Sequence, residues 1–418
     1  MKIIGRTALK SKGVLLLGLA LVAASALPAG QEAGKVIASP VEVRVRVSDG
    51  GRFVDSLGIK DFEILENGLP QSVDALYVVH GQKIDRREES HPVEPSLARS
   101  YYLLFQAVDW DPRLAETIEY LFSSVLLPGD SMTLVTPMKP YNLQKDALAT
   151  KSKAALSKNM QEILRKDIQR GGGEYRDIIK TLRRVSNTLD GNQRTIEDDM
   201  ESDTSSSDFG LEQQLDLYRN AIKRMESIRL VDESKLVAFA NSIKSRPGQK
   251  TVYFFYEREF RPEMSPLTMQ LLLSEYQNNP TIQGNLMDLF QVYKREATFN
   301  ADRVKKAFAD ADLSLNFIFM DKKSQHIFGG SMHEQSEDIF PGFRDLAQST
   351  GGVCEVSQNP AASFKHAAAV SESYYLLYYT PADRPADGSF RPIEVKVKAK
   401  DPAGKDYAVN SRLGYYAR

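Results

Sequence analysis

Few side chains in this 418-residue chain have the types and the spacing that catalysis requires. No glycine-rich run with a lysine opens a helix after a buried strand, so the sequence predicts no phosphate-binding loop. The five histidines form no H-x-x-H or H-E-x-x-H pair, which argues against a histidine-based zinc site. Ser331 lies close to His333 and Glu334, but neighbours in sequence rarely form a catalytic triad. The sequence therefore indicates a protein that is not an enzyme.

The charge balance and the cysteine content limit which partners and which disulfides the chain can have. The 54 basic and 55 acidic residues leave a net charge of −1, which argues against nucleic acid or an anionic membrane as a partner. The single cysteine, Cys354, cannot form a disulfide within the chain and is interpreted as a small buried strand residue. Any partner is therefore expected to be recognised locally.

Residues 1–30 have the three parts of a secretory signal peptide. A basic segment (MKIIGRTALKSKG) precedes an apolar run (VLLLGLALVAASAL) that ends near the small residues Ala24 and Ala26. The run is shorter than the roughly 20 residues that span a bilayer, so cleavage is expected rather than a membrane anchor. The mature protein is expected to be exported, either to the periplasm or out of the cell, with no membrane span after cleavage.

The elements that must position any site fall into a β–α/β–β order. Residues 36–80 alternate between apolar and polar side chains, as strands with one wet face do, and residues 81–98 are interpreted as a polar linker. Buried strands alternate with helices over residues 99–360, which predicts an α/β domain with a mostly parallel, doubly wound sheet. Residues 361–418, a final helix and a β segment, are expected to join the N-terminal strands in a small β-sandwich-like module.

A helical insert is expected inside the α/β domain, with an acidic segment in it. Residues 195–212 hold seven acidic residues, no basic residue and a serine run, which predicts a disordered loop. A cation-binding loop is the alternative interpretation, but the segment lacks the ligand spacing of an EF-hand.

Three loops are the places where the α/β domain could bind a ligand. Ligands of open α/β sheets bind beyond the carboxyl ends of the strands. The loops that follow expected buried strands are QAVDW (106–110), EREF (257–260) and DKKSQH (321–326).

Several segments carry a family resemblance. They are VEVRVRVSDGGRFVDSLGIKDFEILENGLPQSV, LLPGDSMTLVTPM, SRPGQKTVYFFYE, LAQSTGGVCEV and SYYLLYYTPADRPADGSFRPIEVKVKAK, the last followed further on by SRLGYYAR. Together they resemble the exported VWFA-related proteins, a bacterial group of von Willebrand factor A (VWA) domain proteins known from Acidobacteria. The resemblance implies a Rossmann-like VWA domain in the middle of the chain.

In VWA domains the functional site is a metal-ion-dependent adhesion site, and here its motif is degenerate. The family uses an Asp-x-Ser-x-Ser loop after the first strand, a threonine from a second loop and an aspartate after the fourth strand. Gln106 stands where the first aspartate would be, and Val108 and Trp110 stand where the serines would be. GGGEYRD stands where the threonine loop would be and offers Gly173 or Glu174 instead of a threonine. Glu257 falls about where the last aspartate would be.

The resemblance therefore implies an exported, non-enzymatic protein–protein interaction module that works without a cofactor and binds an unidentified protein. The residues expected to contact that partner are Gln106, Asp109, Trp110, Asp111 and Glu257. In an alternative reading, Asp109, Asp111 and Glu257 hold Mg²⁺ or Ca²⁺ and the chain is a metal-dependent adhesin. A third reading is a cell-envelope enzyme, which a Ser/His pair or convergent carboxylates at the strand ends would favour.

Trp110 is the only tryptophan of the chain. An exposed Trp110 would be an interface anchor, because tryptophan is enriched at binding hot spots. A Trp110 packed over the start of the following helix would instead close an empty site.

Overall fold

A computed structural model describes residues 40–143, 146–196, 204–229, 232–293, 300–324, 330–381 and 387–417. The signal peptide expected at residues 1–30 lies outside these ranges. The described residues belong to one compact unit that begins at Ala38. Within these ranges, no helix has both the length and the apolar character needed to cross a membrane.

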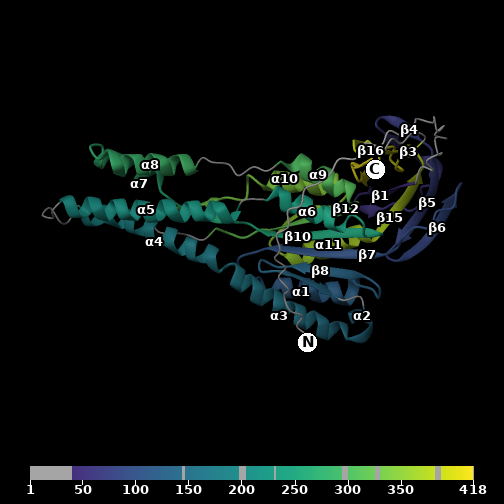
Figure 1. Cartoon of the computed structure of the whole chain (residues 1–418), viewed down its shortest axis with the longest axis horizontal. Coiled ribbons are helices and arrows are strands. Elements are labelled where there is room, and N and C mark those ends of the chain that lie inside the picture. Colours follow the sequence, from purple (N-terminus) through teal and green to yellow (C-terminus); the bar gives the residue numbers. More distant parts are fainter. Residues whose placement is uncertain are drawn as a thin grey trace, which may run out of the picture. The chain divides into compact units, whose positions relative to one another are not determined.

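A six-stranded sheet occupies the middle of the chain (Figure 1). Its order is β14-β12-β10-β7-β8-β9, in which the first five strands pair in parallel and β9 pairs antiparallel with β8. The strands are β7 (Arg99–Gln106), β8 (Ser131–Val135), β9 (Pro140–Leu143), β10 (Gln249–Glu257), β12 (Leu313–Met320) and β14 (Cys354–Ser357).

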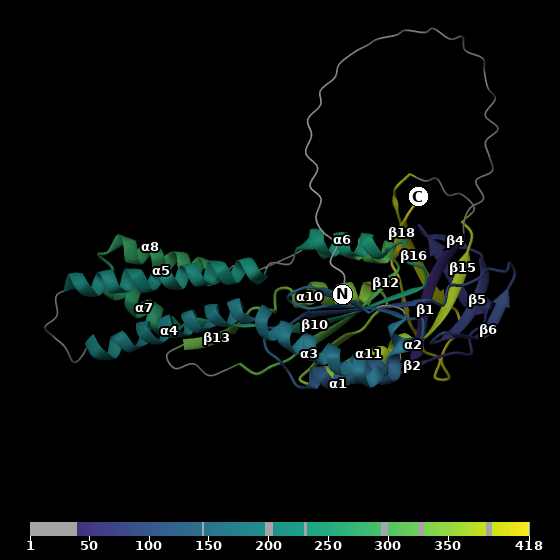
Figure 2. The ribbon, with the colours of Figure 1, turned by 60° about the horizontal axis from the view of Figure 1, so that its bottom comes forward.

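Helices cover both faces of this sheet, which explains why its central strands are apolar runs without alternation (Figure 2). One face is covered by α1 (Arg113–Tyr120), η2 (Leu121–Val125), α2 (Ala147–Thr150), α3 (Lys153–Gly171) and α11 (Pro360–Glu372). The other face is covered by α6 (Glu233–Ile243), α9 (Ala301–Asp310) and α10 (Phe340–Ser349).

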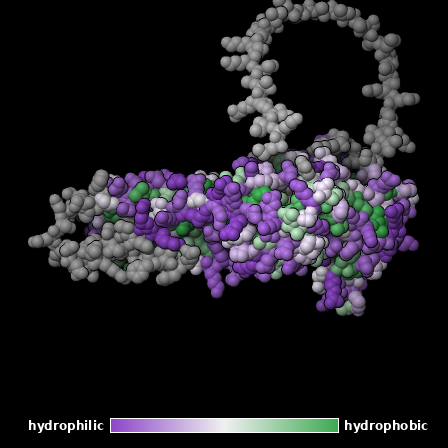
Figure 3. All heavy atoms as spheres, turned by 90° about the horizontal axis from the view of Figure 1, so that it is seen from below, coloured by the Kyte–Doolittle hydropathy of each residue, from purple (hydrophilic) through white to green (hydrophobic). Residues whose placement is uncertain are grey.

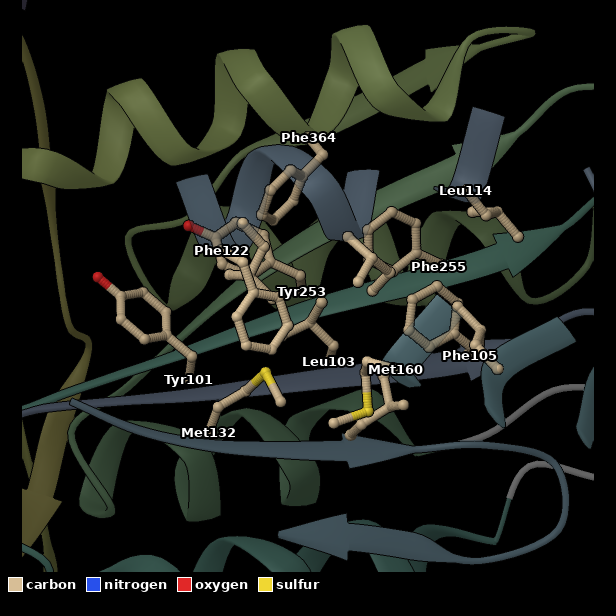
Figure 4. Packing of buried hydrophobic residues seen from close by; sticks show 14 of the residues in the cluster. Tyr101, Leu103, Phe105, Leu114, Phe122, Met132, Met160, Tyr253, Phe255 and Phe364 are labelled. Atoms are coloured by element: carbon tan, nitrogen blue, oxygen red, sulfur yellow. The ribbon is translucent and has the colours of Figure 1, made fainter. Parts of the chain in front are cut away.

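Aromatic side chains fill the space between the sheet and the first set of helices (Figure 4). The rings of Phe105 and Phe255, on neighbouring strands, are stacked with centroids 4.5 Å apart. Phe364 of α11 packs edge-on against Tyr253 with centroids 4.8 Å apart. Each such buried side chain stabilises the fold by about 1.5–3 kcal/mol, so the ends of β7 and β10 are held rigidly side by side.

Strands from both ends of the chain form two antiparallel sheets. The first has the order β17-β1-β15-β5-β6, with β2 beside β1, and the second has the order β18-β16-β3-β4. Alternating valines of β1 and apolar residues of β3, β15 and β16 meet in one core between them. The strands are β1 (Val41–Asp49), β2 (Arg52–Phe53), β3 (Phe62–Glu66), β4 (Leu69–Gln71), β5 (Val73–His80), β6 (Lys83–Glu89), β15 (Ser373–Tyr379), β16 (Phe390–Val397), β17 (Ala408–Ser411) and β18 (Gly414–Tyr416), with the short helix η1 (Ile59–Asp61).

An ionic network joins these antiparallel strands to the central sheet. Asp312, just before β12, has a positive φ of 50° and pairs with Arg44 of β1 at 3.0 Å. Arg412 lies 3.9 Å from the same carboxylate. Burial alone would raise the pKa of Asp312, but the positive charges of Arg44, Arg412 and Lys250 outweigh it and lower that pKa.

The fold class expected from the sequence is wrong. Over the described residues the chain is a mixed α/β fold in which most strand pairings are antiparallel, one sheet curls into a half-barrel and 42% of the residues are helical. Among the described strands, parallel pairing is limited to five strands of one of the four sheets. The strands near the chain ends are joined by short turns, which favour antiparallel pairing, and they outnumber the parallel strands. A mostly parallel, doubly wound Rossmann-like sheet therefore does not describe this protein.

The linker interpretation of residues 81–98 is also wrong in part. Lys83–Glu89 forms β6, which pairs with β5 at the edge of the first antiparallel sheet. Its outward side chains are charged, as is common for edge strands, and only Ile84 packs on the apolar face. The polar composition that suggested a linker is the composition of an exposed edge strand.

A helical subdomain is formed by segments between β9 and β12 together with β13, which follows β12 in the chain. Its helices are α4 (Gly173–Ile196), α5 (Thr204–Arg229), α7 (Pro266–Glu275) and α8 (Pro280–Tyr293), and its small sheet is β11 (Phe260–Met264) with β13 (Gly330–Glu334). Apolar side chains from all four helices share one core. The expected disordered loop is corrected here: residues 204–212 begin α5, and Leu211 is buried in that core, whereas residues 197–203 lie outside the described ranges.

Candidate functional site

The loop after β7 and the end of β10 meet at the carboxyl edge of the parallel strands. Glu257 is the last residue of β10, and its side chain is buried. Its Oε2 accepts hydrogen bonds from the backbone N–H of Val108 at 2.7 Å and of Asp109 at 3.1 Å. Because β7 and β10 are parallel neighbours, the register places the loop directly beside this carboxylate. Glu257 therefore fixes the conformation of the loop.

Lys322 supplies the positive charge of this cluster. It follows β12, and its Nζ donates to Oε1 of Glu257 at 2.6 Å and to Oδ2 of Asp109 at 3.3 Å. Burial would lower the pKa of the Lys322 ammonium, but the charges and hydrogen bonds of the two carboxylates outweigh it and raise that pKa above its ordinary value. Lys322 is therefore charged at neutral pH and bridges the ends of two strands. We name Asp109, Glu257 and Lys322 the strand-end cluster.

The junction between α3 and α4 closes the other side of the loop. The guanidinium of Arg176 donates to the carbonyl oxygens of Val108 and Gln169 and lies 3.9 Å from Asp109. A Cβ added to Gly172 would lie 2.2 Å from the oxygen of Val108, so only glycine allows this close approach. The glycine run that interrupts the helical pattern thus seats α4 against the site.

The structure separates the residues that the sequence analysis grouped as partner-binding. Asp109 and Glu257 come together through Lys322, as described above. Gln106 is exposed at the end of β7. Trp110 is half-buried and packs against the core of the central sheet. Asp111 accepts hydrogen bonds from the backbone and the guanidinium of Arg113.

The metal-ligand set Asp109, Asp111 and Glu257 does not converge. Asp111 is paired with Arg113, and the other two carboxylates share the ammonium of Lys322. Throughout the described ranges, no group of three or more His, Cys, Asp or Glu side chains has an arrangement that could hold a metal ion.

A pocket of about 490 Å³ opens next to the strand-end cluster, and we name it the basic pocket. It is lined by cationic side chains on one part and by apolar side chains on another. The lining residues are Asp109, Tyr175, Arg176, Ile179, Lys180, Arg183, Phe260, Lys322, Lys323 and Met332. Most come from α4, β11, β13 and the loop after β12.

Sequence reasoning did not find Lys322 or the pocket. The loop 321–326 was a candidate because it follows a buried strand, but a lysine after a strand is not by itself a signal of a site. The sequence does predict the cationic face of α4. Arg176, Lys180 and Arg183 have the i, i+4, i+7 spacing that places side chains on one helix face.

A second polar cluster lies in the first antiparallel sheet, where β5 ends and β15 begins. Nδ1 of His80 is 2.8 Å from Oγ of Ser373, and Nε2 of His80 is 3.5 Å from a carboxylate oxygen of Glu372. His80 and Ser373 line a pocket of about 260 Å³. The side chains of His80 and Glu372 are 57% and 50% exposed, so water competes for each of these contacts.

No protein-family model matches the chain, and no curated protein or solved structure is significantly similar to it.

Proposed function

We propose that the chain is an exported, non-enzymatic protein-interaction module, related to the VWFA group, whose recognition edge works without a metal ion. The observation that carries the proposal is the ammonium of Lys322 between Glu257 and Asp109. A cation at the ends of parallel strands is what an adhesion site needs in order to hold its loops. In our proposal the ammonium of Lys322, a cation that belongs to the chain itself, holds the loops instead.

The energetics support an internal cation over a bound one. Removing one partner of a buried ion pair costs about 3–5 kcal/mol, and the cost is lower for a pair that water reaches. A divalent ion would have to displace the ammonium from Glu257 and would then find only two carboxylates from the protein. Such a site is weak, because Ca²⁺ prefers six to eight oxygen ligands.

Metal titration tests the metal-independent part of the proposal. Mg²⁺, Mn²⁺ and Ca²⁺ are added to EDTA-treated protein while Trp110 fluorescence and the melting temperature are followed. We expect no saturable change in the wild-type protein at millimolar metal. Lys322→Ala leaves the two carboxylates without their cation, so this variant should gain a metal-dependent rise in melting temperature.

The matched control is Lys323→Ala, which removes the neighbouring exposed lysine and leaves the ion pair of Lys322 intact. It should behave like the wild type. A saturable wild-type response that disappears in Glu257→Ala would overturn the proposal in favour of the metal-dependent adhesin.

Site-specific crosslinking tests the interaction part. A photoreactive benzoylphenylalanine replaces exposed Gln106 at the strand ends or, as the control, exposed Lys158 on α3. Irradiation in cells of the source organism should give a discrete protein adduct from position 106 that EDTA does not change. Equal adducts from both positions, or none from position 106, would contradict a recognition edge at the strand ends.

A second candidate function is hydrolysis, and the contact between His80 and Ser373 is the observation that favours it. A histidine beside a serine hydroxyl can act as its general base, with Glu372 orienting the ring. The high exposure of the ring makes this arrangement weaker than a buried catalytic set. A fluorophosphonate probe that labels the wild type but not Ser373→Ala, with Ser123→Ala as the exposed control, would support the hydrolase; absence of labelling removes it.

A further inference from the structure

We propose that the basic pocket binds an acidic peptide segment of a protein partner. The carboxylates of the peptide would contact the lysines of the pocket, and an apolar side chain of the peptide would contact the aromatic wall of the pocket. The inference rests on the proposed interaction function, because it names the chemistry of the partner. Besides residues of segments compared with the adhesion motif, it uses residues of α4, β11 and β13 that lie outside them, among them Lys180, Phe260 and Met332.

The charge of the pocket is local and one-sided. Five cationic side chains line it, and Asp109 is the only carboxylate among the lining residues. The chain as a whole has a net charge of −1, so this excess does not reflect a generally basic protein. A concave surface with one sign of charge concentrates ligands of the opposite sign.

Several of these cations have donors left for a ligand. An ammonium group has three N–H donors, and Lys322 uses two of them on Glu257 and Asp109. Within the described part of the chain, Lys180 and Lys323 make no ion pair, and both are exposed. Lys180 also stands four residues after Arg176, a like-charge spacing that destabilises a helix slightly unless an anion binds there.

The remaining wall of the pocket is apolar and preorganised. The hydroxyl of Tyr175 donates to the carbonyl oxygen of Phe260 at 2.9 Å, which fixes the position of the buried tyrosine ring. Ile179 and Met332 complete this wall. A single inorganic anion would leave the wall unused, whereas a volume of about 490 Å³ accommodates several atoms of both kinds. The combination fits a short peptide that carries carboxylates around an apolar residue.

On the face shown in Figure 3, hydrophilic residues dominate and apolar ones form small separate patches.

The test uses a fluorescein-labelled peptide, GDEFDEG, and fluorescence anisotropy with the purified chain. We expect saturable binding that weakens when salt rises from 50 to 200 mM, since exposed charges are screened. The neutral peptide GNQFNQG should not bind measurably, and GDEADEG should bind at least threefold more weakly than GDEFDEG. Equal binding of GDEFDEG and GNQFNQG, or of GDEFDEG and GDEADEG, would overturn the proposal.

Two double variants locate the binding. Lys180→Glu with Lys323→Glu reverses the two exposed positive charges of the pocket and should weaken binding at least tenfold. Lys158→Glu with Lys166→Glu makes the same change of charge at exposed positions of α3 and should change binding less than threefold. Equal losses would mean a diffuse field effect, and the pocket would not be the site.

Two further outcomes would overturn the pocket inference, and the second of them leaves the proposed interaction function intact. If inorganic phosphate or citrate displaces the peptide at concentrations below the dissociation constant of the peptide, the pocket is a small-anion site and the proposal fails. If the peptide does not bind while the EDTA-independent adduct from position 106 persists, the pocket inference fails and the interaction module stands.

Discussion

Glu66 and Glu257 both place a carboxylate among hydrogen-bond donors and one basic side chain, but in different surroundings. Glu66, in the antiparallel strands, accepts from Arg391 at 2.9 Å and from the hydroxyls of Tyr379 at 2.5 Å and Tyr415 at 3.0 Å. Both members of its ion pair are buried, with 4% and 6% of their side chains exposed. In the pair of Glu257 with Lys322, the exposed fractions are 9% and 32%.

This difference separates a structural cluster from an accessible one. Every donor around Glu66 is a side chain of the same pair of antiparallel sheets, so the cluster connects β3, β15, β16 and β18. Burial and the neighbouring carboxylate raise the pKa of Tyr379, which keeps its hydroxyl protonated as a donor. Lys322, in contrast, faces a pocket and has an N–H donor left. A buried network that is closed to water specifies packing, whereas one that opens on a pocket can exchange partners.

The largest loss of stability should come from removing Glu66 from its buried cluster. Glu66→Ala removes one buried carboxylate that a buried guanidinium and two tyrosine hydroxyls share, so we expect the free energy of unfolding to fall by about 3–5 kcal/mol. Urea denaturation followed by circular dichroism measures it. Glu66→Gln keeps the shape and one acceptor oxygen and should cost less. A loss below 1 kcal/mol for Glu66→Ala would show that water reaches the cluster.

The strand-end cluster should tolerate the loss of its glutamate better. Glu257→Ala removes the acceptor of two backbone N–H groups and of Lys322, and we expect a loss of about 1–3 kcal/mol, because the loop and the ammonium lie near water. The fluorescence of Trp110 should also change, since this residue is the last one of the released loop. If Glu257→Ala lowers the free energy of unfolding as much as Glu66→Ala does, the strand-end cluster is structural too, and the two clusters do not differ in role.

The sequence predicted those parts of the site that depend on local pattern. Apolar runs marked β7 and β10 as buried strands, and Glu257 was placed correctly at the end of one of them. Asp109 and Glu257 were grouped, and they do share a cluster. Their common partner was not found, because Lys322 joins them only through the register of three strands that are far apart in sequence.

Long-range pairing also explains the errors in the fold. Alternation of strands and helices suggested one doubly wound sheet, but it could not show how many strands near the chain ends pair antiparallel. β6 carries almost no apolar residue, so its sequence resembles a linker until β5 is beside it. The acidic composition of residues 204–212 hid a helix whose Leu211 finds its partners on other helices.

The pH dependence of Lys322 gives the smallest effect and the sharpest comparison of the two clusters. Its folded-state pKa is raised, so its stabilisation is complete below the ordinary lysine pKa of about 10.4 and is lost as pH rises through the folded-state value. The difference in free energy of unfolding between wild type and Lys322→Met should be about 0.5–1.5 kcal/mol from pH 6 to 9, because water partly screens the pair. It should shrink at higher pH.

Lys323→Met is the control for that measurement, because its exposed ammonium has no ion pair in the described part of the chain. Its difference from the wild type should stay near zero over the whole range, so alkaline ionisation of the tyrosines cancels in the comparison. A Lys322→Met difference that grows with pH would mean that the neutral amine, not the ammonium, stabilises the fold. In that case Lys322 could not act as the internal cation of the strand-end cluster.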